Sequence, residues 1–366
     1  MSKRKNIDII FIALFCVAIL SMGLCVIMLS PRNFSDKENR PLAEAPDFSA
    51  SSVLSGQFFE ELSLFIKDQF PLRNSLISMH SICELSFGKA QINGIIPTEN
   101  RALVAIPQAN DTDKIKANIS AIRALSNNDP LIYVPVRSID MFNKYLPRIY
   151  DYSKNTLIFP ALPQSSIRLF KDFLENADDG YYYKTDHHWT TEGAFFAYNQ
   201  ICQELGITAY NEKYFLKETV SNSFRGTSYS RSGLPDFAVD SENIILYRYT
   251  GDSQVNVFNH ETEESRKGFY DYDALDTSDK YRIFLGGNYS HLSISLDDSI
   301  KKPKLLLVKD SFANSIVPFL ALHYDIEVVD PRYCSTAYLE EQLKREEFER
   351  TLVMLSFDTL AQINVN

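Results

Sequence analysis

Residues 304–314 read KLLLVKDSFAN, a short apolar run that ends in a polar turn. The run has no polar alternation, which is typical of a parallel strand that helices bury on both faces. Beyond the turn, Ile316, Phe319 and Leu320 have helical spacing. Ser311 is therefore predicted at the point where a strand gives way to a helix. Ligands of open parallel sheets bind beyond the carboxyl ends of such strands, so we expect Ser311 to lie in a functional site.

Pro318 falls inside the helix expected after Ser311, where a proline costs about 3 kcal/mol. Either this helix is kinked, or its first turn is separate and Pro318 begins a new helix. A serine in such a turn routinely caps a helix. The same position also presents a hydroxyl group beside backbone amides that can hold an oxyanion. The two roles are compatible, and the strand-turn-helix context favours a nucleophile.

Further apolar runs of strand length alternate with helical patterns along the chain, which predicts an α/β fold with a parallel sheet covered by helices. Residues 210–280 break the alternation and are rich in Ser, Asn, Asp, Gly and Tyr, so we interpret them as a β-containing insertion over the site. The expected strands are residues 102–106, 131–136, 283–285, 326–329 and 352–355, and the expected helices are residues 58–70, 72–87, 115–125, 166–174, 194–205 and 338–349.

The N-terminal segment predicts a membrane anchor, because residues 9–29 carry no charge and a spanning helix needs about 20 apolar residues. Lys3, Arg4 and Lys5 precede this stretch, which by the positive-inside rule leaves the N-terminus in the cytoplasm and the rest outside. A cleaved signal peptide is the alternative, but no small-x-small site follows. The expected organisation is a cytoplasmic N-terminus (1–6), an anchor in the cytoplasmic membrane (7–29), a membrane-proximal linker with helices (30–95) and a catalytic domain (96–366).

The net charge of −10 argues against nucleic acid as a partner, because phosphate binding needs a concentrated basic face.

Residues 185–190 read TDHHWT and bring together a carboxylate, two imidazoles and the only tryptophan of the chain. If residues 181–186 are extended, Asp186 and His188 share one face and His187 points away. An Asp that orients a His forms the base end of a nucleophilic triad. The alternative is a structural Asp–His hydrogen bond without chemistry.

His187 and Trp189, which flank His188, have other expected roles. His187, on the opposite face, is expected to pack or to support the pair. A metal site from Asp186, His187 and His188 is not expected, because the ligands would have to converge from opposite faces, and no cofactor is expected either. Trp189 fits equally well as a platform for a sugar ring and as a core residue.

The TDHHWT block, with residues 192–195 (EGAF) downstream, resembles the DHHW protein family of SGNH-hydrolase-like bacterial proteins. Residues 38–42 (ENRPL) and 68–73 (DQFPLR) resemble segments of the related extracytoplasmic alginate O-acetylation proteins. Residues 309–311 (KDS), followed by Asn314 and PFL, resemble the serine block of the family. The resemblance covers the chain beyond the anchor.

This resemblance implies a flavodoxin-like α/β/α sandwich with Ser311 as nucleophile, His188 as base and Asp186 as the residue that orients it. Two departures from the wider group are Lys309 in place of a glycine and an Asp–His pair that precedes the serine. Gly287 and Asn288 are the candidate oxyanion donors, with a tight turn as the alternative. In the insertion, Arg225 and Tyr229 are candidate saccharide contacts, with a solvated loop as the alternative.

The expected function is transfer of acetyl groups to hydroxyls of a cell-surface polysaccharide through an acyl-serine. An esterase would use the same residues with water as the acceptor. A non-catalytic polysaccharide-binding or assembly protein is a third possibility. The resemblance further implies a membrane O-acyltransferase as the acyl donor. His260 and His291 have no carboxylate-rich context in the sequence and receive no role.

Overall fold

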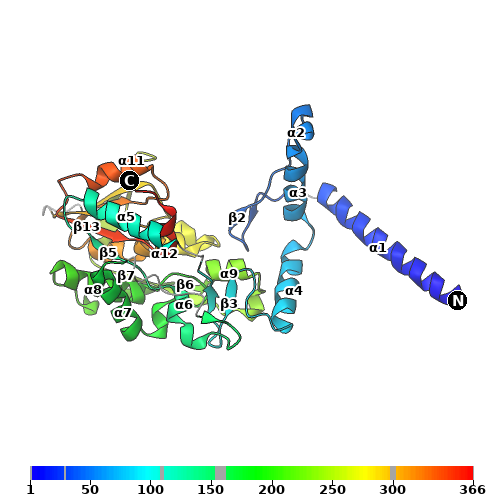
Figure 1. The fold of residues 1–366 in the computed structure, drawn as a ribbon, viewed down its shortest axis with the longest axis horizontal. Helices are drawn as coiled ribbons and strands as arrows, with labels where there is room; N and C mark the ends of the chain where they lie inside the picture. Colours follow the sequence, from blue (N-terminus) through cyan, green and yellow to red (C-terminus); the bar gives the residue numbers. More distant parts are fainter. Residues whose placement is uncertain (1, 29, 108–110, 153–161, 297–301, 366) are drawn as a thin grey trace. The chain divides into compact units, whose positions relative to one another are not determined.

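The computed structural model describes residues 2–28, 30–107, 111–152, 162–296 and 302–365 (Figure 1). The chain divides into two compact units. The first consists of Met1–Lys89 with Gly233–Ala238, and the second consists of Ala90–Ser232 with Val239–Asn366.

The first unit is mainly helical. Residues 7–26 of helix α1 have a mean hydropathy of 2.9, so α1 is long and apolar enough to cross a membrane, a property that signal sequences share. The two helices predicted after the linker are confirmed as α3 and α4, and Pro71 separates them. The elements of this unit are α1 (Ser2–Met28), β1 (Phe34–Ser35), β2 (Arg40–Pro41), α2 (Ala50–Ser55), α3 (Gln57–Gln69), α4 (Arg73–Ser86) and η6 (Asp236–Ala238).

An ion-pair network joins the ENRPL and DQFPLR segments within this unit. The Arg40 guanidinium donates to both carboxylate oxygens of Asp68, at 2.9 and 2.6 Å, and the Ala43 amide donates to Asp68 at 2.9 Å. Arg73 donates to Glu38 at 2.7 Å. The hydrogen bond from Arg40 lowers the pKa of Asp68 to about 2, against the opposing effect of its burial.

A seven-stranded mixed sheet forms the centre of the second unit, in the order β5-β13-β11-β12-β10-β8-β9. The first four strands run parallel, and β10 is antiparallel to both β12 and β8. This confirms the α/β class with a largely parallel sheet. The strands are β5 (Leu131–Tyr133), β8 (Val255–Asn259), β9 (Glu264–Lys267), β10 (His291–Leu296), β11 (Lys304–Lys309), β12 (Asp325–Val329) and β13 (Arg350–Met354).

Two groups of helices accompany this sheet. Helix α5 (Thr112–Leu125) packs against α11 (Thr336–Leu343) and α12 (Phe357–Gln362), whereas α8 (Thr191–Leu205) packs against α7 (Gln164–Asn176) and α10 (Val317–Leu320). Figure 1 shows α5 and α11 on one side of β5 and β13, and α7 and α8 on the other.

Smaller elements complete the unit. The further helices are α6 (Ser138–Met141), α9 (Thr227–Ser232), η1 (Asn143–Tyr145), η4 (Asp179–Tyr181), η5 (Glu212–Tyr214), η7 (Asp252–Gln254), η8 (Tyr272–Asp276), η9 (Lys280–Ile283) and η10 (Ser311–Ser315). Two separate hairpin sheets are β3 (Ile95–Pro97) with β4 (Leu103–Ala105), and β6 (Leu216–Phe224) with β7 (Glu242–Arg248).

Several predicted elements differ from the structure. Residues 283–285 are not a strand: η9 ends there, and Leu285 has a φ of 64°. The strand at 102–106 pairs with β3 outside the main sheet. Helix α11 ends at Leu343, six residues before its predicted end. The insertion does contain β-structure, but its strands β8 and β9 continue the main sheet because β8 pairs with β10.

Strand β11 carries the predicted turn into the centre of the sheet. Residues 305–308 are fully buried between β12 and β13, as the continuous apolar run predicts. The chain beyond it forms η10 and then α10, with Pro318 in the first turn of α10. The separate first turn is therefore confirmed, since a proline at a helix start loses no hydrogen bond.

Candidate active site

Ser311 opens η10 directly after β11, in a turn that Asp310 holds in place. Asp310 Oδ1 accepts a hydrogen bond from the Phe312 amide at 3.1 Å. Its Oδ2 accepts from the Ser356 amide at 2.7 Å and from the Thr359 hydroxyl at 2.9 Å. Asp310 therefore caps the turn and ties it to the start of α12, so that Asp310, and not Ser311, performs the capping role.

The TDHHWT block forms a closed loop instead of an extended segment. Tyr182 bridges Trp189, and the Tyr183 amide donates to the His188 carbonyl at 3.2 Å. From β7, the Glu242 carboxylate accepts from the Lys184 amide at 2.8 Å. The predicted extended geometry is wrong, because this hairpin-like closure bends the six residues between Tyr182 and Trp189.

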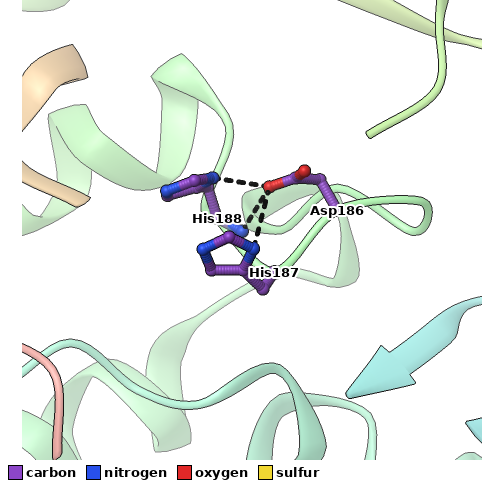
Figure 2. A group of neighbouring side chains, drawn as sticks. All are labelled: Asp186, His187 and His188. Atoms are coloured by element: carbon purple, nitrogen blue, oxygen red, sulfur yellow. Dashed lines mark hydrogen bonds and ion pairs between the residues drawn. The ribbon is translucent and has the colours of Figure 1, made fainter. Parts of the chain in front are cut away.

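This bend also places His187 beside the Asp186 carboxylate, although the extended geometry predicted that His187 points away from it. His187 Nδ1 lies 3.5 Å from Asp186 Oδ1, and the two imidazole centroids are 3.8 Å apart. Figure 2 shows both imidazoles directed at the one carboxylate. The Thr227 hydroxyl lies 2.8 Å from His187 Nδ1. His187 therefore belongs to the site rather than to the opposite face.

Asp186 is buried, and both of its carboxylate oxygens accept hydrogen bonds. Its Oδ1 accepts from the His188 amide at 2.9 Å and lies 2.5 Å from His188 Nδ1. Its Oδ2 accepts from the Thr227 amide at 2.6 Å and from the Thr227 hydroxyl at 2.9 Å. Gly226 makes this approach possible, because a Cβ at that position would lie 2.1 Å from Asp186 Oδ2.

These contacts fix the charge of the carboxylate. Burial alone would raise the pKa of Asp186, but the neighbouring imidazoles and the hydrogen bonds from His188 and Thr227 lower it below its usual range. Burial and the adjacent His188 lower the pKa of His187 to about 4. At neutral pH the site thus holds an ionised Asp186 and a neutral His187.

His188 connects this carboxylate to Ser311, although the two blocks are 123 residues apart: its Nε2 lies 2.8 Å from Ser311 Oγ. An ionised carboxylate only accepts, so Nδ1 of His188 must donate to Asp186. In the neutral imidazole, Nε2 then carries the lone pair and accepts the Ser311 proton. The structure therefore brings the three predicted residues together in the tautomer that a general base requires.

Two aromatic residues support this arrangement. Trp189 is fully buried, and its Nε1 donates to the Phe312 carbonyl at 2.9 Å and to the Ser315 hydroxyl at 3.0 Å. The interpretation of Trp189 as a sugar platform is therefore wrong. Tyr281 stacks on the His188 imidazole, with centroids 4.0 Å apart and planes at 7°.

A cavity of about 280 Å³ opens beside Ser311. Its wall includes Asp310, Ser311 and His187, together with the polar side chains of Arg137, Ser138, Thr227, Ser228, Arg231, Arg332, Asp358 and Gln362. Arg137 and Arg332 are each held by a carboxylate, Asp140 and Asp330 respectively, whereas the exposed Arg231 comes from the insertion.

The other predicted site residues do not line this cavity. Gly287 and Asn288 form a glycine-rich turn, and Asn288 Oδ1 accepts from buried Lys309 at 3.1 Å. Arg225 donates to the Val239 carbonyl at 3.0 Å and lies over the Tyr229 ring, and Tyr229 is buried. The insertion does reach the cavity, but through Thr227, Ser228 and Arg231.

Sequence reasoning missed Thr227, Tyr281 and Asp310. Asp310 adjoins Ser311 in the sequence, and the N-cap preference of Asp before a helical run could have identified it. Gly226 next to Thr227 was a weaker signal of close backbone approach. Tyr281 had no distinguishing pattern.

The site also has the composition of a metal centre. One ligand atom from each of Asp186, His187 and His188 lies within 4.8 Å of the others, so the premise of opposite faces is wrong. However, His188 Nδ1 faces Asp186 and its Nε2 faces Ser311, so the imidazole connects the buried carboxylate to a hydroxyl that lines the cavity. These contacts suit an acid–base relay better than metal coordination.

An α/β fold that directs a buried Asp–His pair at a strand-end serine defines a class of site used in acyl transfer and ester hydrolysis. This chain belongs to the DHHW protein family, whose model matches residues 138–329. The matched region contains Asp186, His188 and Ser311, and the resemblance found in the sequence is confirmed.

Solved structures share the fold at low sequence identity. A DHHW family protein from Eubacterium siraeum is 18% identical, with a TM-score of 0.57 over 74% of this chain and 93% of its own. Bacillus cereus PatB1 with a sulfonyl adduct is 20% identical, with a TM-score of 0.56 over 73% and 95%. The O-acetyltransferase domain of Pseudomonas putida AlgJ is 15% identical, with a TM-score of 0.39 over 74% and 93%. No curated protein matches the sequence.

Proposed function

We propose that this protein is a membrane-anchored, extracytoplasmic enzyme that transfers acetyl groups to hydroxyls of a cell-surface polysaccharide. The observation that carries the proposal is the 2.8 Å contact between His188 Nε2 and Ser311 Oγ, with Asp186 behind the imidazole. The proposal places the second unit in the SGNH-hydrolase-like group, with a flavodoxin-like α/β/α arrangement.

In the first half of the proposed reaction, His188 Nε2 takes the Ser311 proton while Ser311 Oγ attacks the acetyl carbonyl carbon. Asp186 stabilises the imidazolium that forms. The tetrahedral intermediate then collapses: the bond to the leaving alkoxide breaks, and that oxygen takes the proton from His188. The products of this half are an acyl-serine and an alcohol.

In the second half, a polysaccharide hydroxyl gives its proton to His188 and attacks the acyl carbon. The Ser311–acyl bond breaks, Ser311 regains a proton from His188, and the acetylated sugar leaves. The cavity beside Ser311 would receive the donor and then the acceptor. The acyl donor would come from a membrane O-acyltransferase partner, which suits an anchored enzyme.

The chemistry is tested with the full-length chain in detergent micelles. We expect it to hydrolyse a chromogenic acetyl ester and, with an oligosaccharide acceptor present, to form acetylated sugar. Both activities should disappear in Ser311→Ala. Hydrolysis of the ester at the same rate with and without the oligosaccharide, and no acetylated sugar, would indicate an esterase. Binding of the glycan without turnover of the ester would indicate a binding protein. Equal turnover in wild type and Ser311→Ala would exclude Ser311 as nucleophile.

A second readout identifies the nucleophile directly. A similar structure, PatB1, carries a sulfonyl adduct. An activated serine reacts with sulfonyl fluorides, so peptide mass spectrometry should place one sulfonyl group on Ser311 of this chain. His188→Ala should lose the modification, because the hydroxyl is then no longer activated.

The anchored topology has its own test. Cys83 is exposed in the first unit, whereas Cys202 is buried in the second. Cys334 is half-buried, so it is first replaced by serine. A membrane-impermeant maleimide added to intact cells should then label Cys334→Ser and not the double variant Cys83→Ser/Cys334→Ser. Labelling only after lysis would place this unit inside the cell. Release of the labelled chain from the membrane by carbonate would favour a cleaved signal peptide.

A further inference from the structure

His260, His291 and Glu327 form a second cluster of metal-ligating side chains, outside the site described above. One ligand atom from each residue lies within 4.8 Å of the others. We infer that this cluster is a divalent metal site that prefers zinc, with two imidazoles and one carboxylate as ligands.

The cluster is built by the register of the antiparallel half of the sheet. Ser293 of β10 pairs with Glu327 of β12, and His291 lies two residues before Ser293 on the same face. The turn after β8 brings His260 alongside, because its amide donates to the His291 carbonyl at 3.2 Å. Three strands that are distant in sequence therefore contribute to one position.

Short polar contacts connect the side chains of the cluster, and two of these contacts end at the same Glu327 oxygen. His291 Nε2 lies 2.7 Å from Glu327 Oε2, and the Ser293 hydroxyl lies 2.6 Å from the same oxygen. His260 Nε2 is 2.6 Å from Ser293 Oγ. Zinc bonds of about 2.0–2.2 Å at a tetrahedral angle place two ligand atoms about 3.4 Å apart. His291 Nε2 and Glu327 Oε2 would therefore move apart by about 0.7 Å to hold one ion.

Tyr338 of α11 supplies the supporting contact that metal-bound histidines characteristically have. Its hydroxyl lies 2.6 Å from His291 Nδ1. If Nδ1 donates a proton to this hydroxyl, Nε2 has a free lone pair that faces Glu327. In this tautomer Nε2 and the Glu327 oxygen are both acceptors, so a cation bound by both of them would remove their mutual repulsion.

The exposure of the ligands allows an ion to enter. His260 is exposed and its ring stacks on that of His291, with centroids 3.7 Å apart, so a rotation of this one side chain can direct a nitrogen at the ion. His291 is buried and Glu327 is half-buried, so the surrounding residues fix the positions of these two ligands.

Two imidazoles and a carboxylate suit zinc, with water or Ser293 Oγ in the fourth position. A bound ion would join the β8, β10 and β12 segments, and none of its three ligands lines the cavity at Ser311. The site would therefore be structural, and its occupancy would stabilise the fold rather than supply chemistry.

The test uses full-length protein in detergent, stripped with a chelator and dialysed against zinc. Mass-spectrometric metal analysis should find one zinc per chain, and Tm should rise with zinc concentration. His260→Ala and Glu327→Gln should lose this zinc, and neither should unfold the protein, because His260 is exposed and glutamine has the shape of glutamate. Tyr338→Phe should weaken binding by about 10- to 100-fold.

Two controls locate the ion. His80→Ala alters an exposed histidine of the first unit and should retain the zinc. His188→Ala should also retain it. Loss of zinc in His188→Ala would place the ion at the Asp186 cluster and overturn the inference. Failure of the wild type to retain zinc, or full retention by both His260→Ala and Glu327→Gln, would overturn it as well.

Discussion

The indole nitrogen of Trp189 donates a 2.9 Å hydrogen bond to the carbonyl of Phe312, which joins the loop carrying His188 to the turn carrying Ser311. The same nitrogen lies 3.0 Å from the Ser315 hydroxyl. Trp189 thus sets the distance between the base and the nucleophile, although it contacts neither the cavity nor any group that reacts.

We expect Trp189→Phe to lower kcat for ester hydrolysis more than it raises KM, because the substitution loosens the approach of His188 to Ser311. Leaving the Phe312 carbonyl without its donor should also cost about 1–3 kcal/mol of unfolding free energy. Steady-state kinetics and urea denaturation measure the two effects. A variant with wild-type kcat would show that the backbone alone holds the two halves together.

Asp186→Asn should reduce kcat by about 10³- to 10⁴-fold, because an amide can donate to His188 and thereby turn its Nε2 from acceptor into donor. The circular dichroism spectrum should remain that of the wild type. Asp129→Asn is the matched control, since Asp129 pairs with Arg123 on the surface. Loss of activity below tenfold in Asp186→Asn would remove Asp186 from the relay.

Gly226→Ala tests the close approach of the insertion to the relay. The added Cβ would lie 2.1 Å from Asp186 Oδ2, so either the carboxylate or the backbone must move. We expect a loss of about 1–3 kcal/mol of stability together with most of the activity. Gly180→Ala is the control, because its Cβ would lie at an ordinary 3.5 Å from Asp178. Equal activity in both variants would contradict the geometry.

The lowered pKa of His187 predicts a loss of stability in mild acid. Its folded-state pKa is about 4 and its unfolded value is near 6.5, so the unfolded chain binds the extra proton and stability falls as pH drops from about 6.5 to 4. Because its side chain is 38% exposed, we expect only about 1 kcal/mol. Urea midpoints across this range should depend less on pH in His187→Gln than in the wild type. His80→Gln should behave as the wild type does.

The ion-pair network around Asp68 should lose its contribution to stability at a lower pH than the His187 contacts do. The folded pKa of Asp68 is about 2 against an unfolded value of 3.8, so its contribution is complete above pH 3.8 and is lost as pH falls towards 2. Asp68→Asn should remove it at neutral pH, at a cost of about 1 kcal/mol because Arg40 is partly exposed. Faster amide exchange at Ala43, whose amide donates to Asp68, measures this change. Unchanged exchange would mean that the network is held by packing alone.

The parts of the site that were predictable from sequence are those set by local pattern. The apolar run before Ser311 specified a buried strand, and Asp186 with His188 specified an oriented base. The conformation of the loop between them was not predictable, because the Tyr182–Trp189 bridge and Glu242 from β7 bend it. The prediction that Asp186 and His188 meet succeeded through an Asx-type turn and not through the strand alternation invoked for it.

Contacts that depend on strand register could not be predicted from the sequence. Ser293 faces Glu327 because β10 runs antiparallel to β12. The alternation of apolar residues and serines in residues 291–296 (HLSISL) is a strand signal that was overlooked, but it does not specify the partner strand or the register. Residues 283–285 were predicted as a strand because they form a compact apolar run. Their side chains are buried, but the residues form the end of a 3₁₀ turn and a left-handed Leu285. Buried apolar runs of this length do not distinguish strand from turn.

The position of β13 ties the Ser311 turn to a part of the chain that is synthesised after it. Strand β13 lies between β5 and β11, and it brings Ser356 and Thr359 to the Asp310 carboxylate. Such distant pairing makes for slow folding, because the loop must close before its contacts form. A nascent chain that stops before residue 350 has no partner for β5 and no anchor for the Ser311 turn. A fragment that ends before β13 would consequently lack the contacts that hold the Ser311 turn in place.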